Sequence, residues 1–311
     1  MTRLKSVIAC TGLILGSTLA FAQSSTEAVE PAVAASTSYN FTEVNFTNDT
    51  FTQLLAINST GVIAGYHGSG LDPAHPNQGF TVTLSSNGTP TFTAMNYPKS
   101  VQTQVVGIDN LGHTSGFYVD TNNLTHGFFQ HDGVFSTVNF PLTTFNQLLS
   151  ANNNDQAAGY SQDSKGNFHP YVWNRSSPFL SLLLLNSVSA QATGINDGGA
   201  ISGFSIDPKG VTHGFLFIKG RYVILNYPGS TGTQALGVNN NNLVVGSYTD
   251  ATANTHGFVY NFATNKYQQV DDPNGIGTTL INGINDAGTL VGFWGNTAGG
   301  ISHGFVATVQ P

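Results

Sequence analysis

The sequence predicts an all-β fold, a six-bladed β-propeller with four-stranded blades, and three observations support this prediction. One motif recurs six times along the chain, each copy has room for four short strands, and the two chain ends supply complementary parts of one blade. Units of about 40–45 residues with four strands each are typical of propeller blades. Outside the N-terminal leader, no segment has the 3.6-residue apolar periodicity of a helix, so we expect no helices.

Each copy of the motif has a marker residue, a glycine twelve positions later, and an aromatic residue further on. The markers are Gln53, Gln104, Gln147, Gln191, Gln234 and Leu280. The glycines are Gly65, Gly116, Gly159, Gly203, Gly246 and Gly292. The aromatic residues are Phe80, Phe128, Tyr171, Phe215, Phe258 and Phe305. A spacing kept in six copies indicates one structural unit per copy.

Four strands follow in order within each copy. The first is an apolar run such as residues 53–57, ended by an Asn/Asp/Gly turn. The second surrounds the spaced glycine, as in residues 200–205, and the third begins at a His-Gly-Phe step. The fourth resembles residues 135–140. We expect the spaced glycines to allow close backbone approach where blades pack near the axis.

The chain ends predict how the ring closes. The last copy stops after its third strand, whereas residues 41–46 precede the first copy without a partner. Those six residues match residues 135–140 at four positions. We therefore expect the N-terminal strand to complete the last blade, within a propeller domain of residues 39–311. Such closure removes exposed sheet edges.

The segment before the propeller has the features of an export signal. Arg3 and Lys5 precede an apolar run over residues 7–19, and small residues stand at 20 and 22. This pattern predicts a signal peptide of residues 1–22, cleaved after Ala22, and a secreted or periplasmic protein. Residues 23–38 are expected to form a flexible linker. No other apolar run approaches the ~20 residues of a membrane span, and the single cysteine, Cys10, lies in the leader.

The repeated phrase resembles a known family. Residues 283–288 read Gly-Ile-Asn-Asp-Ala-Gly, with Val291-Gly292 and His303-Gly304-Phe305 following, and residues 194–199 are close to the same phrase. This pattern is similar to the bacterial extracellular HAF-repeat family, although His-Gly-Phe stands here where the family name implies His-Ala-Phe. The resemblance covers residues 40–309. It implies an exported repeat protein from a family whose general activity is unknown, and it transfers no catalytic residue.

Charge and composition exclude some partners. Only 8% of the 311 residues are charged, and nine Lys and Arg against 16 Asp and Glu give a net charge of −7. Nucleic-acid binding requires clustered basic residues, so we expect no nucleic-acid partner. A hydrophobic content of 40% argues against disorder.

Five histidines occupy the repeat position at the third strand: His126, His169, His213, His256 and His303. An aspartate stands six residues before four of them, namely Asp120, Asp163, Asp207 and Asp250. Asp/His pairs can bind metals or transfer protons. Repetition in every blade instead favours a structural hydrogen bond within each blade hairpin, because a catalytic site needs one asymmetric constellation. We expect no cofactor and no metal site.

The turns after the first strands are rich in Asn and Asp and could be interpreted as calcium loops. They lack the alternating acidic spacing and the bidentate Glu of a dedicated site, so tight-turn chemistry is favoured. These turn residues are Asn58, Asp109, Asn110, Asn152, Asn153, Asn196, Asp197, Asn239, Asn240, Asn285 and Asp286.

Departures from the repeat are the candidate functional positions. The first copy has a longer loop that contains His67, Asp72 and His75. We take these three as a tentative ligand-binding site, on the propeller face that also contains the Pro-containing blade connections. Aromatic residues beside the spaced glycines either stack on sugars or pack the blades. They are Tyr66, Tyr118, Tyr160, Tyr248 and Trp294.

Residues 179–185 form an almost unbroken apolar run that ends in four leucines. On an outermost strand, alternation would turn half of them outward. Leu183 and Leu185 are therefore a candidate interface, with a surface covered by the N-terminal linker and an ordinary edge strand as the alternatives.

Taken together, these features favour an exported binding or scaffold module for a glycan or protein partner, rather than an enzyme. One alternative is a secreted hydrolase or lyase with its site at the channel mouth, and another is a purely structural surface protein. The enzyme alternative requires His67, Asp72 and His75 to converge within hydrogen-bond or metal-ligand reach.

Overall fold

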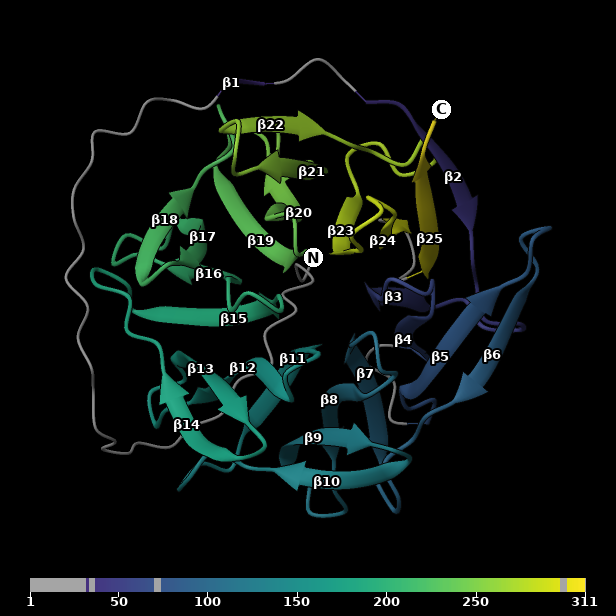
Figure 1. Ribbon diagram of the computed structural model, residues 1–311, viewed down its shortest axis with the longest axis vertical. Coiled ribbons are helices and arrows are strands. Elements are labelled where there is room, and N and C mark those ends of the chain that lie inside the picture. Colours follow the sequence, from purple (N-terminus) through teal and green to yellow (C-terminus); the bar gives the residue numbers. More distant parts are fainter. Residues whose placement is uncertain (1–31, 34–36, 70–73, 297–300, 311) are drawn as a thin grey trace.

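The computed structural model describes residues 32–33, 37–69, 74–296 and 301–310, and their strands form a six-bladed β-propeller (Figure 1). Six sheets surround one axis, and each contains four antiparallel strands in order from the axis outward, to which one sheet adds a fifth, parallel strand. No helix occurs among the described residues, and none of them forms a helix that could span a membrane. The predicted fold class is therefore confirmed.

Blades one to three have the following strands. Blade one contains β3 (Thr52–Ile57), β4 (Ile63–His67), β5 (Gln78–Leu84) and β6 (Pro90–Ala94). Blade two contains β7 (Gln102–Ile108), β8 (Thr114–Val119), β9 (Thr125–His131) and β10 (Val134–Val138). Blade three contains β11 (Asn146–Asn152), β12 (Gln156–Gln162), β13 (Phe168–Asn174) and β14 (Ser177–Ser181).

Blades four to six repeat this order. Blade four contains β15 (Ser189–Ile195), β16 (Ile201–Ile206), β17 (Thr212–Ile218) and β18 (Arg221–Leu225). Blade five contains β19 (Gly232–Val238), β20 (Leu243–Thr249), β21 (Thr255–Asn261) and β22 (Lys266–Gln269). Blade six contains β23 (Thr279–Ile284), β24 (Leu290–Asn296), β25 (Ile301–Val309) and, from the other chain end, β2 (Tyr39–Glu43).

The N-terminal strand closes the ring as predicted. Strand β2 pairs antiparallel with β25, in a register that runs from Tyr39 opposite Val309 to Glu43 opposite Phe305. Val44, the next residue, is buried in the core and its amide donates to the Gly304 carbonyl at 2.8 Å. Blade six is thus assembled from both ends of the chain, and β25 has no free edge.

Part of the predicted linker also pairs with the propeller. Strand β1 (Ala32–Val33) lies parallel to β22, with Ala32 opposite Lys266 and Val33 opposite Tyr267. The Gln268 side chain donates to the Thr37 carbonyl at 2.7 Å. These residues of the expected linker 23–38 therefore form a fifth strand on blade five. The predicted signal peptide, residues 1–22, lies outside the described residues.

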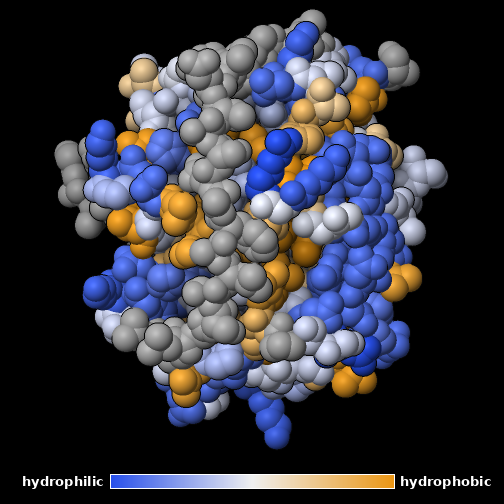
Figure 2. Space-filling view, turned by 60° about the vertical axis from the view of Figure 1, so that its left-hand side comes forward, coloured by the Kyte–Doolittle hydropathy of each residue, from blue (hydrophilic) through white to orange (hydrophobic). Residues whose placement is uncertain are grey.

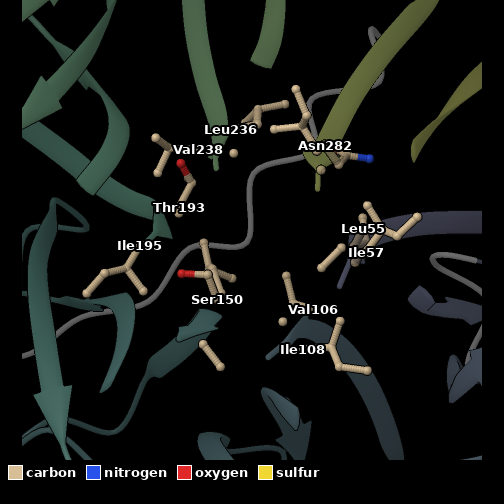
Figure 3. A pocket seen from close by; sticks show the side chains of 18 residues that line it. Leu55, Ile57, Val106, Ile108, Ser150, Thr193, Ile195, Leu236, Val238 and Asn282 are labelled. Atoms are coloured by element: carbon tan, nitrogen blue, oxygen red, sulfur yellow. The ribbon is translucent and has the colours of Figure 1, made fainter. Parts of the chain in front are cut away.

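Every innermost strand contains a β-bulge at the same repeat position. The register skips one residue in each strand, and the skipped residues are Leu55, Val106, Leu149, Thr193, Leu236 and Asn282. A bulge leaves one residue unpaired and bends its strand. All six residues line the axial cavity (Figure 3).

The spaced glycines have a different role from the one expected. A Cβ on Gly65 would lie 2.3 Å from the Gln53 carbonyl oxygen and 3.0 Å from the Phe80 ring, both in the same blade. The close approach is thus inside the blade, between the first two strands and under the aromatic ring of the third. Another glycine provides the contact between blades, because a Cβ on Gly107 would lie 2.6 Å from Ser150 Cα in the next blade.

The aromatic residues of the third strands form the centre of the core. All six are fully buried: Phe80, Phe128, Tyr171, Phe215, Phe258 and Phe305. Burial of a side chain of this size stabilises the fold by about 1.5–3 kcal/mol. The repeated aromatic position of the sequence therefore marks the interior of each blade.

The apolar run 179–185 only partly belongs to an outer strand, because β14 ends at Ser181. Leu182 and Leu184 are buried, whereas Leu183 and Leu185 are 45% and 52% exposed. The exposed pair thus lies in the connection to blade four and not on the outermost strand itself. Figure 2 shows hydrophobic surface on the side that carries β14 and β18. An interface at this pair stays a prediction.

Candidate functional site

The meander of each blade divides its loops between two faces. Turns between the first and second strands lie on one face, which we call the turn face. Loops between the second and third strands, and the connections to the next blade, lie on the other, which we call the connection face. Loops held by a rigid ring are where propellers place variable function.

Two histidines of the predicted site converge on a carboxylate of the connection face. His67 Nδ1 lies 2.8 Å from Asp49 Oδ2, and His75 Nε2 lies 3.2 Å from the same oxygen. The Asp49 side chain is only 4% exposed, whereas that of His75 is 54% exposed. The third predicted residue, Asp72, lies outside the described residues. A carboxylate between two imidazoles can bind a hydroxyl-rich ligand or transfer a proton.

Local structure fixes Asp49 and His67 in place. The Phe51 amide donates to Asp49 Oδ1 at 3.2 Å, so the second carboxylate oxygen remains for the histidines. The Phe46 ring stacks on the His67 imidazole, with centroids 3.5 Å apart and planes 3° apart. His67 ends β4, while Phe46 and Asp49 come from the connection that precedes β3. The site therefore joins the segment that follows the closing strand β2 to blade one.

Sequence reasoning missed Asp49, although a signal for it exists. Four residues before the marker, four of the other five connections have a hydroxyl residue, namely Ser100, Thr143, Ser187 and Ser230, and the fifth has Ile276. Three of those hydroxyls donate to a backbone carbonyl three residues earlier. An ionised carboxylate has no proton to donate, so it cannot make that bond. Asp49 therefore departs from the repeat pattern, as His67 and His75 do.

The repeated Asp/His pairs are brought together within their own hairpins. The Nε2 to Oδ2 distances are 3.3 Å for His126–Asp120, 3.0 Å for His169–Asp163, 3.5 Å for His213–Asp207 and 3.4 Å for His256–Asp250. The other ring nitrogen of three of these histidines faces the outgoing blade connection, at Asn139, Asn226 and Asp271. Each such imidazole thus bridges two loops of one blade, which is a geometry suited to a structural role.

Hydrogen bonds lower the pKa of the paired aspartates. Burial alone would raise the pKa of Asp163, but the His169 ring and the amides of Asn167 and Lys165 lower it to about 2. The Asn254 amide is the largest cause at Asp250, whose pKa is also lowered to about 2. Donors to the charged form stabilise that form. These carboxylates are therefore ionised at neutral pH.

The aromatic residues beside the spaced glycines are mostly covered. Tyr66, Tyr118, Tyr160 and Tyr248 are all buried. The Tyr118 ring stacks on Tyr97 at 3.7 Å, and Tyr248 has the equivalent contact with Tyr227. Their faces pack blades together and are closed to a sugar. Trp294 stacks on His303 at 4.1 Å and is only partly buried.

The channel axis contains a small apolar cavity of about 150 Å³ (Figure 3). Leu55, Val106 and Leu236 are among the lining residues. The polar lining residues Thr193 and Asn282 donate to backbone carbonyls of the next blade, those of Ala235 and Leu54. Pockets for organic ligands have volumes of roughly 300–1,000 Å³. The axis is therefore too narrow for such a ligand.

At the turn face, a ring of Asn and Asp side chains surrounds the axis. Asn239 Oδ1 accepts from the amides of Asn241 and Leu243, which closes the tight turn. Its Nδ2 donates to the Asn285 carbonyl of the next blade at 2.9 Å. The same link joins Asn58 to Asp109, Asn152 to Asn196, Asn196 to Asn239, and Asn285 to Asn58. The sequence predicts the turns, and the structure adds that they tie neighbouring blades together.

Solved structures similar to this chain have the same fold. One is a mutant of the Aleuria aurantia lectin in complex with Fucalpha1-6GlcNAc, with a TM-score of 0.52 and 11% identity over 85% of this chain and 98% of that one. Another is AofleA from Arthrobotrys oligospora, with a TM-score of 0.53 and 9% identity over 90% and 95%. A third is the gluconolactonase XC5397 from Xanthomonas campestris, with a TM-score of 0.50 and 9% identity over 84% and 88%.

No protein-family model matches the chain, and no curated protein matches it either. At identities of 9–11%, similarity to the solved structures shows the fold alone. The fold and the off-repeat cluster on its connection face define the class of protein as a β-propeller module.

Proposed function

We propose that this chain is an exported propeller that binds a glycan at Asp49, His67 and His75. The observation that carries the proposal is the convergence of two off-repeat histidines on one nearly buried carboxylate. Carboxylate and imidazole groups are strong partners for sugar hydroxyls. The Aleuria aurantia lectin, whose structure contains Fucalpha1-6GlcNAc, supports the proposal as a propeller of the same fold that binds a saccharide.

Export and family membership belong to the same proposal. The leader of residues 1–22 supports cleavage after Ala22 and a secreted or periplasmic location. The Gly-Ile-Asn-Asp phrase supports membership of the HAF-repeat family. An extracellular binding module without cysteine in its mature chain would depend on its core and ring closure for stability.

A glycan array followed by calorimetry on the best saccharide tests the proposal. Asp49→Asn and His75→Ala should each weaken the affinity at least tenfold, because each removes a group that faces the site. His169→Ala is the matched control, since the His169 side chain is 56% exposed, almost the same as His75, and belongs to the repeat. An empty array, or equal affinities for all variants, would overturn the proposal.

A hydrolase or lyase is the second candidate, favoured by the 2.8 Å contact between His67 and Asp49, which resembles an acid–base pair. Turnover on a polysaccharide or lactone panel that disappears in Asp49→Asn would support it. Glycan binding without turnover would exclude it on that panel. If the glycan array is empty and a protein ligand is captured instead, the ligand of the binding module is a protein and not a glycan.

A further inference from the structure

Four of the nine histidines stand outside the repeat position, and they form two pairs on opposite faces. His67 and His75 belong to the connection face. His113 and His131 belong to the turn face of blade two, where His113 precedes β8 and His131 ends β9. The other blades have Val62, Gln156, Ala200, Leu243 and Thr289 in place of His113. They have Thr83, Asn174, Ile218, Asn261 and Thr308 in place of His131.

His113 is nearly buried and held by one carboxylate. Its Nδ1 lies 2.9 Å from Asp109 Oδ2, and the other oxygen of Asp109 accepts from the amides of Leu111 and His113. Because an ionised carboxylate only accepts hydrogen bonds, His113 Nδ1 carries the proton. Nε2 of the neutral ring is then left with a free lone pair, and it points to Asp132, with Oδ1 at 3.8 Å.

His131 meets the same carboxylate from the neighbouring strand. Its Nδ1 lies 3.1 Å from Asp132 Oδ2, and its ring stacks on His113 with centroids 3.9 Å apart. On the far side, His131 Nε2 faces Asp155 Oδ1 of blade three at 3.7 Å. Each histidine thus has one nitrogen toward Asp132 and the other toward a separate carboxylate.

This cluster occupies the one junction where the ring of side-chain amides is interrupted. Asp109 replaces the asparagine of the other five blades, and a carboxylate has no N–H to donate to the next blade. The link from blade two to blade three that Asn58, Asn196 and Asn239 make at their own junctions cannot form there. Asp155 lies in the first turn of blade three, so the cluster spans that junction.

We propose that His113 Nε2, His131 Nδ1 and the Asp132 carboxylate bind a divalent transition-metal ion of the zinc class. One ligand atom from each residue lies within 4.8 Å of the others. A tetrahedral ion with bonds of about 2.0–2.1 Å needs its ligand atoms about 3.3–3.4 Å apart. The distance from His131 Nδ1 to Asp132 Oδ2 is 3.1 Å, close to that spacing. His113 Nε2 lies 3.8 Å from Asp132 Oδ1 and the two rings are stacked, so the side chains must turn to surround an ion.

The surroundings fit a cation of this kind. Two imidazoles and one carboxylate suit zinc and its neighbours better than calcium or magnesium. Asp109 and Asp155 stand behind the two ligand histidines in the carboxylate–histidine–metal arrangement that orients such ligands. Three carboxylates, those of Asp109, Asp132 and Asp155, face one cation, Arg175, which is 3.5 Å from Asp155. The Asp132 side chain is 80% exposed, which leaves a coordination position open to water.

Metal binding by chelator-treated protein tests the proposal. Calorimetric titration with Zn²⁺ should give one site per chain, and Co²⁺ should give the visible absorption of a tetrahedral site. His131→Gln and Asp132→Asn should each weaken Zn²⁺ affinity at least 100-fold. His169→Gln, a repeat histidine beside Asp163, is the control and should bind as the wild type does.

The exposed Asp132 side chain makes its substitution safe for folding, so this variant keeps the test valid if His131→Gln unfolds. Zn²⁺ should also raise the melting temperature of the wild type and not that of Asp132→Asn, since a ligand that binds the native state stabilises it. Absence of a 1:1 site, or affinity unchanged in Asp132→Asn, would overturn the proposal. The site is on the face opposite Asp49, so its failure leaves the glycan proposal untouched.

Discussion

Asp272 stands where other blade connections place an aromatic side chain. Tyr97 and Tyr227 precede the connection proline of their blades and stack on a tyrosine of the next blade, whereas Asp272 precedes Pro273. The Asp272 residue is 2% exposed, and its carboxyl accepts from the Asn274 amide at 2.8 Å. Burial raises the pKa of this carboxyl, and the Glu43 carboxylate raises it further. These effects outweigh the Asn274 amide, which lowers the pKa, so the pKa of Asp272 is higher in the folded protein than in the unfolded chain.

Replacing Asp272 with asparagine should stabilise the protein at neutral pH. A folded-state pKa above the unfolded value gives stability that is present at low pH and is lost as the pH rises. Asp272→Asn removes that loss, so its melting temperature should exceed the wild-type value at pH 7, and the difference should shrink near pH 4. Differential scanning calorimetry between pH 4 and 8 measures the melting temperatures of the wild type and of Asp272→Asn.

Asp250→Asn is the contrasting variant for the same measurement. The pKa of Asp250 is lowered, first by the Asn254 amide, so its charged form contributes stability above the unfolded pKa of about 3.9. That contribution is lost as the pH falls toward about 2. This variant should melt lower than the wild type at pH 7. A lower melting temperature for Asp272→Asn at pH 7 would contradict the argument.

Within each blade, the β-bulge of the first strand and the spaced glycine of the second strand depend on each other. The bulge turns the carbonyl of the marker residue toward the second strand, where only a glycine leaves space for it. A Cβ on Gly246 would lie 1.9 Å from the Gln234 carbonyl oxygen, which is backbone and cannot move aside cheaply. The aromatic ring of the third strand then covers the glycine.

Gly246→Ala should therefore destabilise the fold by about 1–3 kcal/mol or more, as overpacked core substitutions do. Gly198→Ala is the control, because the atom nearest to its Cβ would be Asn196 Oδ1 at 3.4 Å and the residue is exposed. It should stay within about 0.5 kcal/mol of the wild type. Urea denaturation gives both values. Equal stabilities of the two variants would refute the account of the bulge.

The same elements explain what sequence could and could not predict. Six spaced glycines and six aromatic residues locate the strands, because spacing along the chain is what a repeat preserves. The sequence predicts a contact between blades for the spaced glycines, whereas Gly65 meets the Gln53 carbonyl of its own blade. The bulge beside that contact is a register shift between strands, which residue spacing does not reveal. Asp49 and the pair of His113 and His131 escaped notice for another reason. Their contacts cross between loops or blades, and only their departure from the repeat signals them.

For the whole molecule, two kinds of contact hold the ring closed: side-chain hydrogen bonds and strand pairing. One is the set of side-chain amides on the turn face, which links five of the six blade junctions, and in which Asn285 donates to the Asn58 carbonyl and so joins blade six to blade one. The other is the pairing of the N-terminal strand β2 with β25, which brings Phe41 against Phe305 with ring centroids 5.3 Å apart. These amides lie near the axis, whereas β2 lies at the outer edge of the ring.

The closing strand can be tested by removing it and supplying it again. A chain of residues 46–311 loses β1, β2 and the buried Val44, and it leaves the β25 edge free to pair with another chain. We expect it to melt at least about 5 °C below the full chain, given the apolar burial lost, and to aggregate. A synthetic peptide of residues 37–45 should restore the melting temperature, because an added strand can pair with a free edge. The same peptide with Val44→Asp should fail to do so. If the truncated chain is monomeric and has the same melting temperature as the full chain, β2 contributes nothing to ring closure.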